Sequence, residues 1–114
     1  MKRIEAIIPQ GTTEDTAREL MKLGVSGMTI YDSKGKGQVE RPQVLSGRGT
    51  GVYRPEFNSN STIVLIVKDA MADKVVQQIL KRTSSGKAGE GKIFVSDITD
   101  AFDIGSDKRG EAAI

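Results

Sequence analysis

The sequence predicts an α+β fold of the ferredoxin-like type, βαββαβ, in which both helices cover one face of an antiparallel sheet. The first observation behind this prediction is that two segments show the apolar period of a helix. The second is that each of them lies between two short apolar segments, four in all. A third is the glycine-containing stretch over residues 33–61, which divides the chain into two similar halves. With 114 residues, the chain has the length of one domain.

The first half contains a strand, a helix and a second strand. Residues 3–9 are rich in isoleucine and end at a proline, which predicts a strand. Thr12 or Thr13 is the expected N-cap of the helix. The helix should end before Gly24, and residues 25–31 form the second expected strand. The apolar stripe of the helix consists of Ala17, Leu20, Met21 and Leu23.

The second half repeats this order. Residues 62–67 are the clearest strand, and Asp69 is the expected cap of the helix that follows. Residues 92–98 form the fourth expected strand, and a polar tail covers residues 103–111. The apolar stripe of the second helix consists of Ala72, Val75, Val76, Ile79 and Leu80.

The strand at residues 62–67 is apolar on both of its faces. Ile63 and Leu65 point to one side, whereas Val64 and Ile66 point to the other. Two helices cover only one face of the sheet. We therefore expect further copies of the chain to bury the second face in a homo-oligomer.

The composition excludes several kinds of site. The chain has no cysteine and no histidine, which removes disulfides, the usual general base and the commonest zinc ligands. Its longest apolar run, residues 63–67, is too short to span a bilayer, and no signal-peptide pattern follows Met1. We expect a cytoplasmic protein without membrane insertion. The formal net charge of +2 does not favour nucleic-acid binding.

Residues 33–61 show neither a helical nor a strand period. Loops longer than about 12–15 residues are uncommon in compact domains and are usually functional or disordered, so we expect a protruding interaction loop. Arg41, Arg48 and Arg54 suit docking into an acidic or carbonyl-lined partner site, or they keep the loop soluble. Tyr53 is a modification or docking site, or an ordinary loop aromatic.

A glycine-rich segment, residues 85–92, precedes the last strand. Its glycines allow backbone N–H groups to approach a ligand, and its lysines suit phosphate. Residues 86–92 match the first seven positions of the Walker pattern, but Ile93 stands where a magnesium-binding hydroxyl belongs. The segment also leads into a strand instead of a helix. It therefore predicts an anion cradle of another kind, or only a turn into the strand.

The segment Ser-Gly-Lys-Ala-Gly-Glu-Gly-Lys-Ile-Phe-Val at residues 85–95, together with residues 27–37 and 109–114, resembles the motifs of the PII signal-transduction proteins. The resemblance covers nearly the whole chain. It implies a homotrimer in which residues 109–114 form a C-terminal strand. It further implies a regulator, not an enzyme, that controls a membrane transporter or a metabolic enzyme in nitrogen or carbon metabolism.

The resemblance also divides the chain and assigns a ligand. Residues 1–114 would form a single PII-like domain with a T-loop at about residues 36–61 and a B-loop at about residues 84–92. Members of the family bind ATP or ADP in clefts between subunits. Carried over to this chain, Thr29 would meet the adenine, and the remaining pocket residues would be Gly35, Lys36 and Gly37 at the T-loop root and Gly89, Glu90, Gly91 and Lys92 in the B-loop.

The chain departs from the family pattern in its loops. Glu90 stands where the B-loop usually has Asp or Tyr, and the tyrosine motif of the T-loop is absent. Val39 replaces a glutamine that helps to bind 2-oxoglutarate and a nucleotide-bound magnesium, and the lysine that pairs with the oxo-acid falls near Asn60. These departures argue against magnesium and against sensing of 2-oxoglutarate.

The phosphate end of the implied site differs as well. Asp103 and Gly105 stand where the family has two arginines that hold the β- and γ-phosphates. A carboxylate near a triphosphate is repulsive, so we expect a less charged ligand such as AMP, ADP or a cyclic nucleotide, with bicarbonate as a further candidate. Alternatively, Lys108, Arg109 or a neighbouring subunit supplies a cation, or Asp103 faces solvent.

Two other functions compete with the regulator. A nucleotide hydrolase is disfavoured because the glycine-rich segment lacks a magnesium-binding hydroxyl and an evident base. RNA binding is possible for a ferredoxin-like sheet, but Tyr31 and Phe94 do not form the aromatic signature of such sheets.

Overall fold

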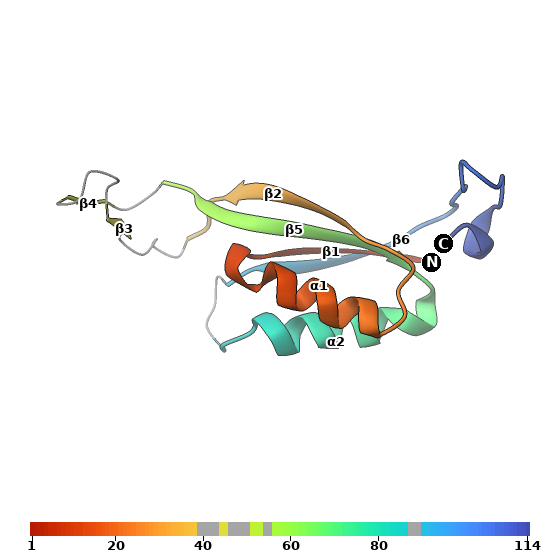
Figure 1. Cartoon of the computed structure of the whole chain (residues 1–114), viewed down its shortest axis with the longest axis horizontal. Helices are drawn as coiled ribbons and strands as arrows, with labels where there is room; N and C mark the ends of the chain where they lie inside the picture. Colours follow the sequence, from red (N-terminus) through yellow and green to blue (C-terminus); the bar gives the residue numbers. More distant parts are fainter. Residues whose placement is uncertain (39–43, 46–50, 54–55, 87–89) are drawn as a thin grey trace.

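The structure, a computed structural model that describes residues 1–38, 44–45, 51–53, 56–86 and 90–114, has a helix layer and a sheet layer (Figure 1). Two short 3-10 helices, η1 (Gln10–Thr12) and η2 (Gly110–Ala113), accompany them. The main elements are β1 (Lys2–Pro9), α1 (Thr13–Lys22), β2 (Thr29–Gly35), β3 (Val44–Leu45), β4 (Val52–Tyr53), β5 (Asn58–Val67), α2 (Asp69–Thr83) and β6 (Lys92–Asp97).

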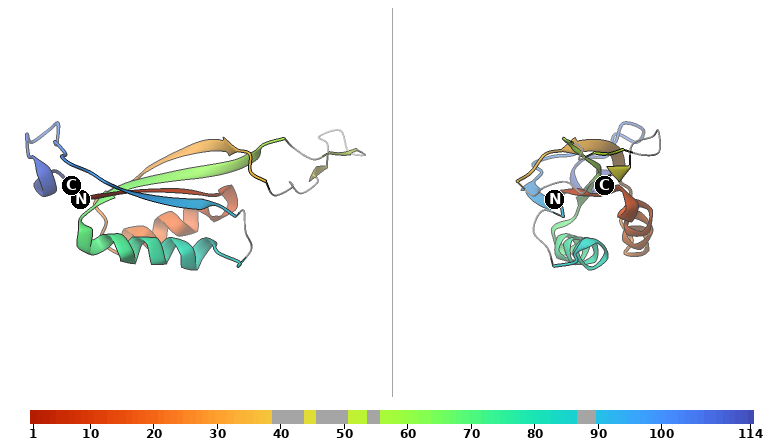
Figure 2. Two further views of the ribbon diagram at one scale, coloured as in Figure 1. Left: turned by 180° about the vertical axis from the view of Figure 1, so that it is seen from behind. Right: turned by 90° about the vertical axis from the view of Figure 1, so that its left-hand side faces the viewer.

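The main sheet has the strand order β2-β5-β1-β6, and each neighbouring pair is antiparallel. Figure 2 shows both helices on the same face of this sheet. This is the ferredoxin-like βαββαβ arrangement, so the predicted fold class is confirmed. No helix in the described part of the chain is both long and apolar enough to cross a membrane.

The core lies between the helices and the two central strands, β1 and β5. Alternate residues of these strands are buried toward the helices, because successive side chains of a strand point to opposite faces. Val64 and Ile66 lie on the other face and are only partly buried, as expected. The buried apolar core consists of Ile4, Ala6, Ile8, Leu20, Val25, Ile63, Leu65, Val67, Ala72, Val75 and Ile79.

The two helices bury narrower stripes than the sequence pattern predicts. Leu20 is fully buried, but Met21, one residue further round the helix, is 51% exposed. In α2, Ile79 is likewise buried, whereas Leu80 is 42% exposed. Each apolar stripe therefore includes a residue, Met21 or Leu80, that the single chain leaves partly exposed. A helical period identifies a stripe, but only the position of the sheet decides which edge of that stripe is covered.

The structure confirms Thr12 as the N-cap residue of α1, but the N-cap of α2 is Lys68 instead of Asp69. Thr12 occupies the N-cap position of α1, but its hydroxyl donates a hydrogen bond to the carbonyl oxygen of Pro9, 2.8 Å away. Asp69 is the first residue of α2, and its carboxylate lies 3.0 Å from the amino group of Met1. Neither side chain caps its helix, because each has another partner nearby.

The boundaries of the second strand and the long loop need correction. The strand begins at Thr29 instead of residue 25, and both β2 and β5 continue into the stretch that was expected to be irregular. Val44 and Leu45 pair with Val52 and Tyr53 within that stretch. A strand extends as far as a neighbouring strand pairs with it, and an apolar pattern does not show where that neighbour lies.

The C-terminal segment does not form the expected strand. Phe102 and Arg109 make a single antiparallel bridge, and Gly110–Ala113 is the 3-10 helix η2. The segment turns back on itself beyond the end of the sheet (Figure 1). The backbone N–H of Asp103 donates to the carbonyl oxygen of Lys108 at 2.8 Å, which closes this turn.

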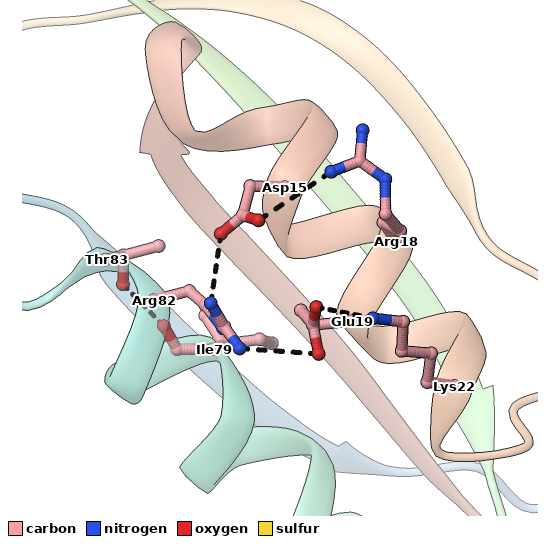
Figure 3. Close-up of polar contacts among 7 residues, drawn as sticks. All are labelled: Asp15, Arg18, Glu19, Lys22, Ile79, Arg82 and Thr83. Carbon is pink, nitrogen blue, oxygen red and sulfur yellow. Dashed lines mark hydrogen bonds and ion pairs between the residues drawn. The ribbon is translucent and has the colours of Figure 1, made fainter.

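Arg82 joins the two helices through carboxylates of α1 (Figure 3). Its guanidinium lies 3.5 Å from Asp15 and 3.3 Å from Glu19, and Glu19 also pairs with Lys22 at 3.0 Å. The hydrogen bond from Lys22, followed by the charge of Arg82, lowers the pKa of Glu19. This contribution to stability is present at neutral pH and is lost as the pH falls through the folded-state pKa.

Thr16 supplies a test of the helix–sheet packing. It is fully buried, and its hydroxyl has no hydrogen-bond partner among the described residues. Thr16→Val should raise the free energy of unfolding by about 1 kcal/mol, because the desolvated hydroxyl is replaced by a methyl group of similar size. Urea denaturation measures this change.

Thr62→Val is the matched control for that variant. Thr62 is also buried, but its hydroxyl shares a hydrogen bond of 2.9 Å with the hydroxyl of Ser33. Its replacement should therefore lower stability by about 1 kcal/mol. Equal destabilisation by the two variants would contradict the unpaired state of Thr16.

Candidate functional site

The candidate ligand residues fall into two groups within one chain. The loop-end group lies at one end of the sheet but on its two opposite edges, because the long loop follows β2 and the glycine-rich segment precedes β6. The second group lies at the start of β2 and in the C-terminal segment, and it consists of Thr29, Asp103 and Gly105. The described members of the loop-end group are Gly35, Lys36, Gly37, Glu90, Gly91 and Lys92.

Several predicted residues cannot be placed. Gly89, Arg41, Arg48 and Arg54 lie outside the described residues. Tyr53 belongs to the short strand β4, where its backbone pairs with Val44. Their expected roles in ligand binding and partner docking stay predictions.

Gly91 is required by the close approach of β6 to β1. Its φ is +154°, and a Cβ atom at this position would lie 2.2 Å from the carbonyl oxygen of Ile7. Real Cβ atoms do not approach a backbone oxygen so closely. A larger residue would therefore push the start of β6 away from β1, and with it the backbone that leads into Lys92.

Glu90 binds Ser85, the residue at the other end of the glycine-rich segment. One carboxylate oxygen accepts a hydrogen bond of 2.8 Å from the backbone N–H of Ser85, and the other accepts from its hydroxyl. The carboxylate therefore has two donors of its own. Glu90 acts on this loop by joining its two ends, a role that the sequence alone did not indicate.

A cavity of about 410 Å³ opens beside this loop, between the C-terminal end of α2 and the start of β6. Gly91, Lys92 and Glu90 stand on its wall, while Ile7, Val76 and Leu80 are among its apolar residues. The volume is within the range of about 300–1,000 Å³ that is usual for small-ligand pockets. An apolar wall beside a lysine suits a ligand with a flat apolar part and an anionic part.

Lys36 lies at the point where β2 ends. Its ammonium group is 3.1 Å from a carboxylate oxygen of Glu56 and 5.9 Å from the centre of the Phe57 ring. Both partners belong to the chain segment that returns into β5. The sequence showed a lysine beside glycines, but its ion partner lies twenty residues away in the chain and is brought close only by strand pairing.

Thr29 lies on the opposite edge strand from Lys92. It is exposed on the face of the sheet without helices and lines a cavity of about 270 Å³. Gly27, Met28, Val64 and the C-terminal Ile114 line the same cavity. The expected adenine contact is therefore accessible, but it is separate from the glycine-rich segment of its own chain.

Asp103 and Gly105 share one tight turn of the C-terminal segment. A carboxylate oxygen of Asp103 accepts hydrogen bonds from both the hydroxyl and the backbone N–H of Ser106, the latter at 2.8 Å. The hydroxyl, and then the N–H, lower the pKa of Asp103. The side chain is exposed, as one alternative anticipated, but it also serves to hold the turn.

Arg109, one possible substitute for the missing arginines, is already engaged. Its guanidinium lies 2.6 Å from Asp100 and 5.0 Å from the centre of the Phe102 ring. The hydrogen bond from Arg109 is the main cause of a lowered pKa of Asp100. Asp100 therefore already neutralises part of the charge that Arg109 could offer to a phosphate.

Ser106→Ala should raise the pKa of Asp103 toward its usual value, because the main donor to the carboxylate is lost. NMR titration of the Asp103 carboxyl carbon measures this, with Ser96→Ala on β6 as the control. The turn is favoured above the unfolded pKa of about 3.9 and loses this support as the pH falls through the folded value. An unchanged Asp103 pKa in Ser106→Ala would refute the role of the hydroxyl.

A metal centre is not evident in the described ranges, which contain no group of three or more acidic side chains close enough to hold an ion. The candidate residues of the described chain offer apolar walls and a lysine at each edge of the sheet. Such features suit a ligand with an apolar part and an anionic part.

The comparisons with known proteins agree with this architecture. The profile of the family described as "Nitrogen regulatory protein P-II" matches residues 1–108. The chain is 34% identical to nitrogen regulatory protein P-II 1 of Escherichia coli K12 and 33% identical to nitrogen regulatory protein P-II of Rhodospirillum rubrum. Each alignment covers 100% of both chains. With the sheet order, the helix layer and the glycine-rich segment before β6, these matches show that the chain belongs to the P-II family of nitrogen regulatory proteins.

Proposed function

We propose that this protein is a P-II regulator that binds an adenine nucleotide between the subunits of a homotrimer. Its long loop, residues 36–61, would then control a transporter or an enzyme of nitrogen or carbon metabolism. The names of the relatives, which describe nitrogen regulatory proteins, support the regulatory role over an enzymatic one. The proposal includes neither magnesium nor 2-oxoglutarate, because Val39 and Asn60 stand at or near the positions where the family has a glutamine and a lysine that help to bind them.

The separation of Thr29 from Lys92 is the observation that carries the proposal. Thr29 is on β2 and Lys92 is on β6, the two edges of the sheet. Three strand spacings of about 4.8 Å and an offset of two residues place the two Cα atoms roughly 16 Å apart. A typical ligand pocket is only about 10 Å across. The two residues of one chain are therefore poorly placed to enclose the same nucleotide, which supports a site shared by two adjacent copies.

The face of the sheet without helices supports assembly. Val64 and Ile66 lie on it, together with Tyr31 and Phe94, which are 46% and 54% exposed. Figure 2 shows that the helices leave this face uncovered. An apolar face of this kind is stabilised when copies of the chain pack against one another.

Titration calorimetry together with mass measurement in solution tests the proposal. ATP, ADP, AMP, a cyclic nucleotide, 2-oxoglutarate and bicarbonate are titrated into the full chain. We expect a mass of three chains and one nucleotide per chain. A stable monomer, or no binding of any adenine nucleotide, would refute the proposal.

A second candidate differs in the ligand: a sensor of AMP, ADP or a cyclic nucleotide. Asp103 favours it, because its exposed carboxylate, whose pKa the hydrogen bonds from Ser106 lower further, carries a negative charge at neutral pH. If the C-terminal turn of one copy approaches the phosphates bound by the next, this charge opposes ATP. AMP or ADP should then bind more tightly than ATP, and Asp103→Asn should reduce this difference in affinity.

A further inference from the structure

An ion pair closes the base of the long loop. Lys36 and Glu56 approach to 3.1 Å, and Phe57 lies beside the same ammonium group. Gly35 and Asn58 form the last pair of the β2–β5 ladder. Lys36 therefore follows the end of β2, and Glu56 lies just before the start of β5. One residue of the pair is thus on each arm of the loop. We call this contact the neck pair.

The neck pair uses a charge that the proposed nucleotide site also needs. Lys36 is expected at the nucleotide pocket through the loop root. Its ammonium group is a compact point charge, and the Glu56 carboxylate beside it both neutralises that charge and repels an approaching phosphate. A phosphate group and the Glu56 carboxylate therefore compete for it.

We propose that Glu56 is an intramolecular competitor of the anionic ligand, and that ligand binding releases the neck pair and loosens the base of the loop. This inference rests on the proposed nucleotide binding. It names the contact within this chain through which an occupied site would reach residues 36–61. Because coupling is reciprocal, a partner that holds the loop with the neck pair closed would lower nucleotide affinity by the same factor.

The exposure of the two side chains makes this competition practicable. Lys36 is 58% exposed and Glu56 is 69% exposed, so water already screens their attraction. Exposed pairs of this kind change an equilibrium by roughly two- to five-fold. A phosphate with two or more charges can therefore displace Glu56, while the pair still biases the loop when the site is empty.

Hydrogen exchange of the full chain without nucleotide tests the closure itself. Peptides that cover the ends of β2 and β5 should exchange faster in Glu56→Gln and in Lys36→Met than in the wild type. Asp73→Asn removes another exposed carboxylate, from α2, and should leave the exchange of these peptides unchanged. Wild-type exchange rates in both neck variants would refute the closure.

Calorimetry with AMP, ADP and ATP tests the competition. Glu56→Gln should bind about two- to five-fold more tightly than the wild type, whereas Asp73→Asn should bind equally. Lys36→Met should bind more weakly, and adding Glu56→Gln to it should bring no gain. The double variant separates competition for Lys36 from the general removal of a negative charge.

The outcomes distinguish the two proposals. If the wild type binds but Glu56→Gln brings no gain, or brings the same gain in the Lys36→Met background, competition is refuted and nucleotide binding stands. If the wild type binds no adenine nucleotide, the proposed function and the competition are both refuted, and hydrogen exchange still decides whether the neck pair closes the loop.

Discussion

Gly91→Ala should lower the free energy of unfolding by about 2–4 kcal/mol, the largest effect expected from an added methyl group at any glycine whose surroundings the structure describes. The new Cβ would lie 2.2 Å from the carbonyl oxygen of Ile7, and the residue would keep a φ of +154°. Backbone atoms cannot yield as a flexible side chain does. The start of β6 must therefore move, which weakens its pairing with β1.

Urea denaturation at a fixed protein concentration measures this effect, because assembly makes stability depend on concentration. Gly11→Ala is the control: a Cβ atom there would meet nothing within 4 Å. It should change stability by less than about 0.5 kcal/mol. Equal midpoints for the two variants would show that the approach of Gly91 to β1 is not rigid.

Lys92→Met should weaken nucleotide binding by about ten- to a hundred-fold, the range expected when one charge-assisted hydrogen bond to phosphate is lost. Lys92 lines the cavity of about 410 Å³ between α2 and the start of β6, beside the backbone of Gly91. Methionine keeps most of the length and apolar surface of the side chain, so the change isolates the charge.

Calorimetry with the same nucleotide panel measures the loss, and Lys74→Met on the exposed side of α2 is the control for one lost positive charge. The loss of affinity should be greater for ADP than for AMP, because ADP carries more negative charge on its phosphates. If both lysine variants bind as tightly as the wild type, the phosphates do not lie at the glycine-rich segment.

Much of the fold was predictable from local patterns. The continuous apolar run of residues 62–67 and the helical period of the stripe from Ala72 to Leu80 are each long enough to identify one element, and both elements are present in the structure. The C-terminal segment was not predictable in this way. Its turn depends on the hydrogen bonds from Ser106 to Asp103 and on the ion pair between Arg109 and Asp100. The strand that the family resemblance implies for this segment gives no indication of these contacts.

The candidate site was predictable as a set of residues but not as an arrangement. Glycines and lysines identified the loop-end group by their chemistry, and Gly91 has the close backbone approach that such a glycine implies. The partners of these residues were missed. Glu90 pairs with Ser85 across a loop, and Lys36 pairs with Glu56 across the base of another. Neither pairing leaves a signal in residue spacing.

The sequence by itself determined the order of the elements, the glycine-rich segment and the apolar character of both faces of β5, because these follow from composition and from periods of two and 3.6 residues. Only the tertiary structure decided that Thr29 and Lys92 lie on opposite edges of the sheet, and that Glu56 reaches Lys36. The physical reason is that both depend on strand order and register. Hydrogen bonds between residues distant in the chain establish that order, and no local pattern encodes it.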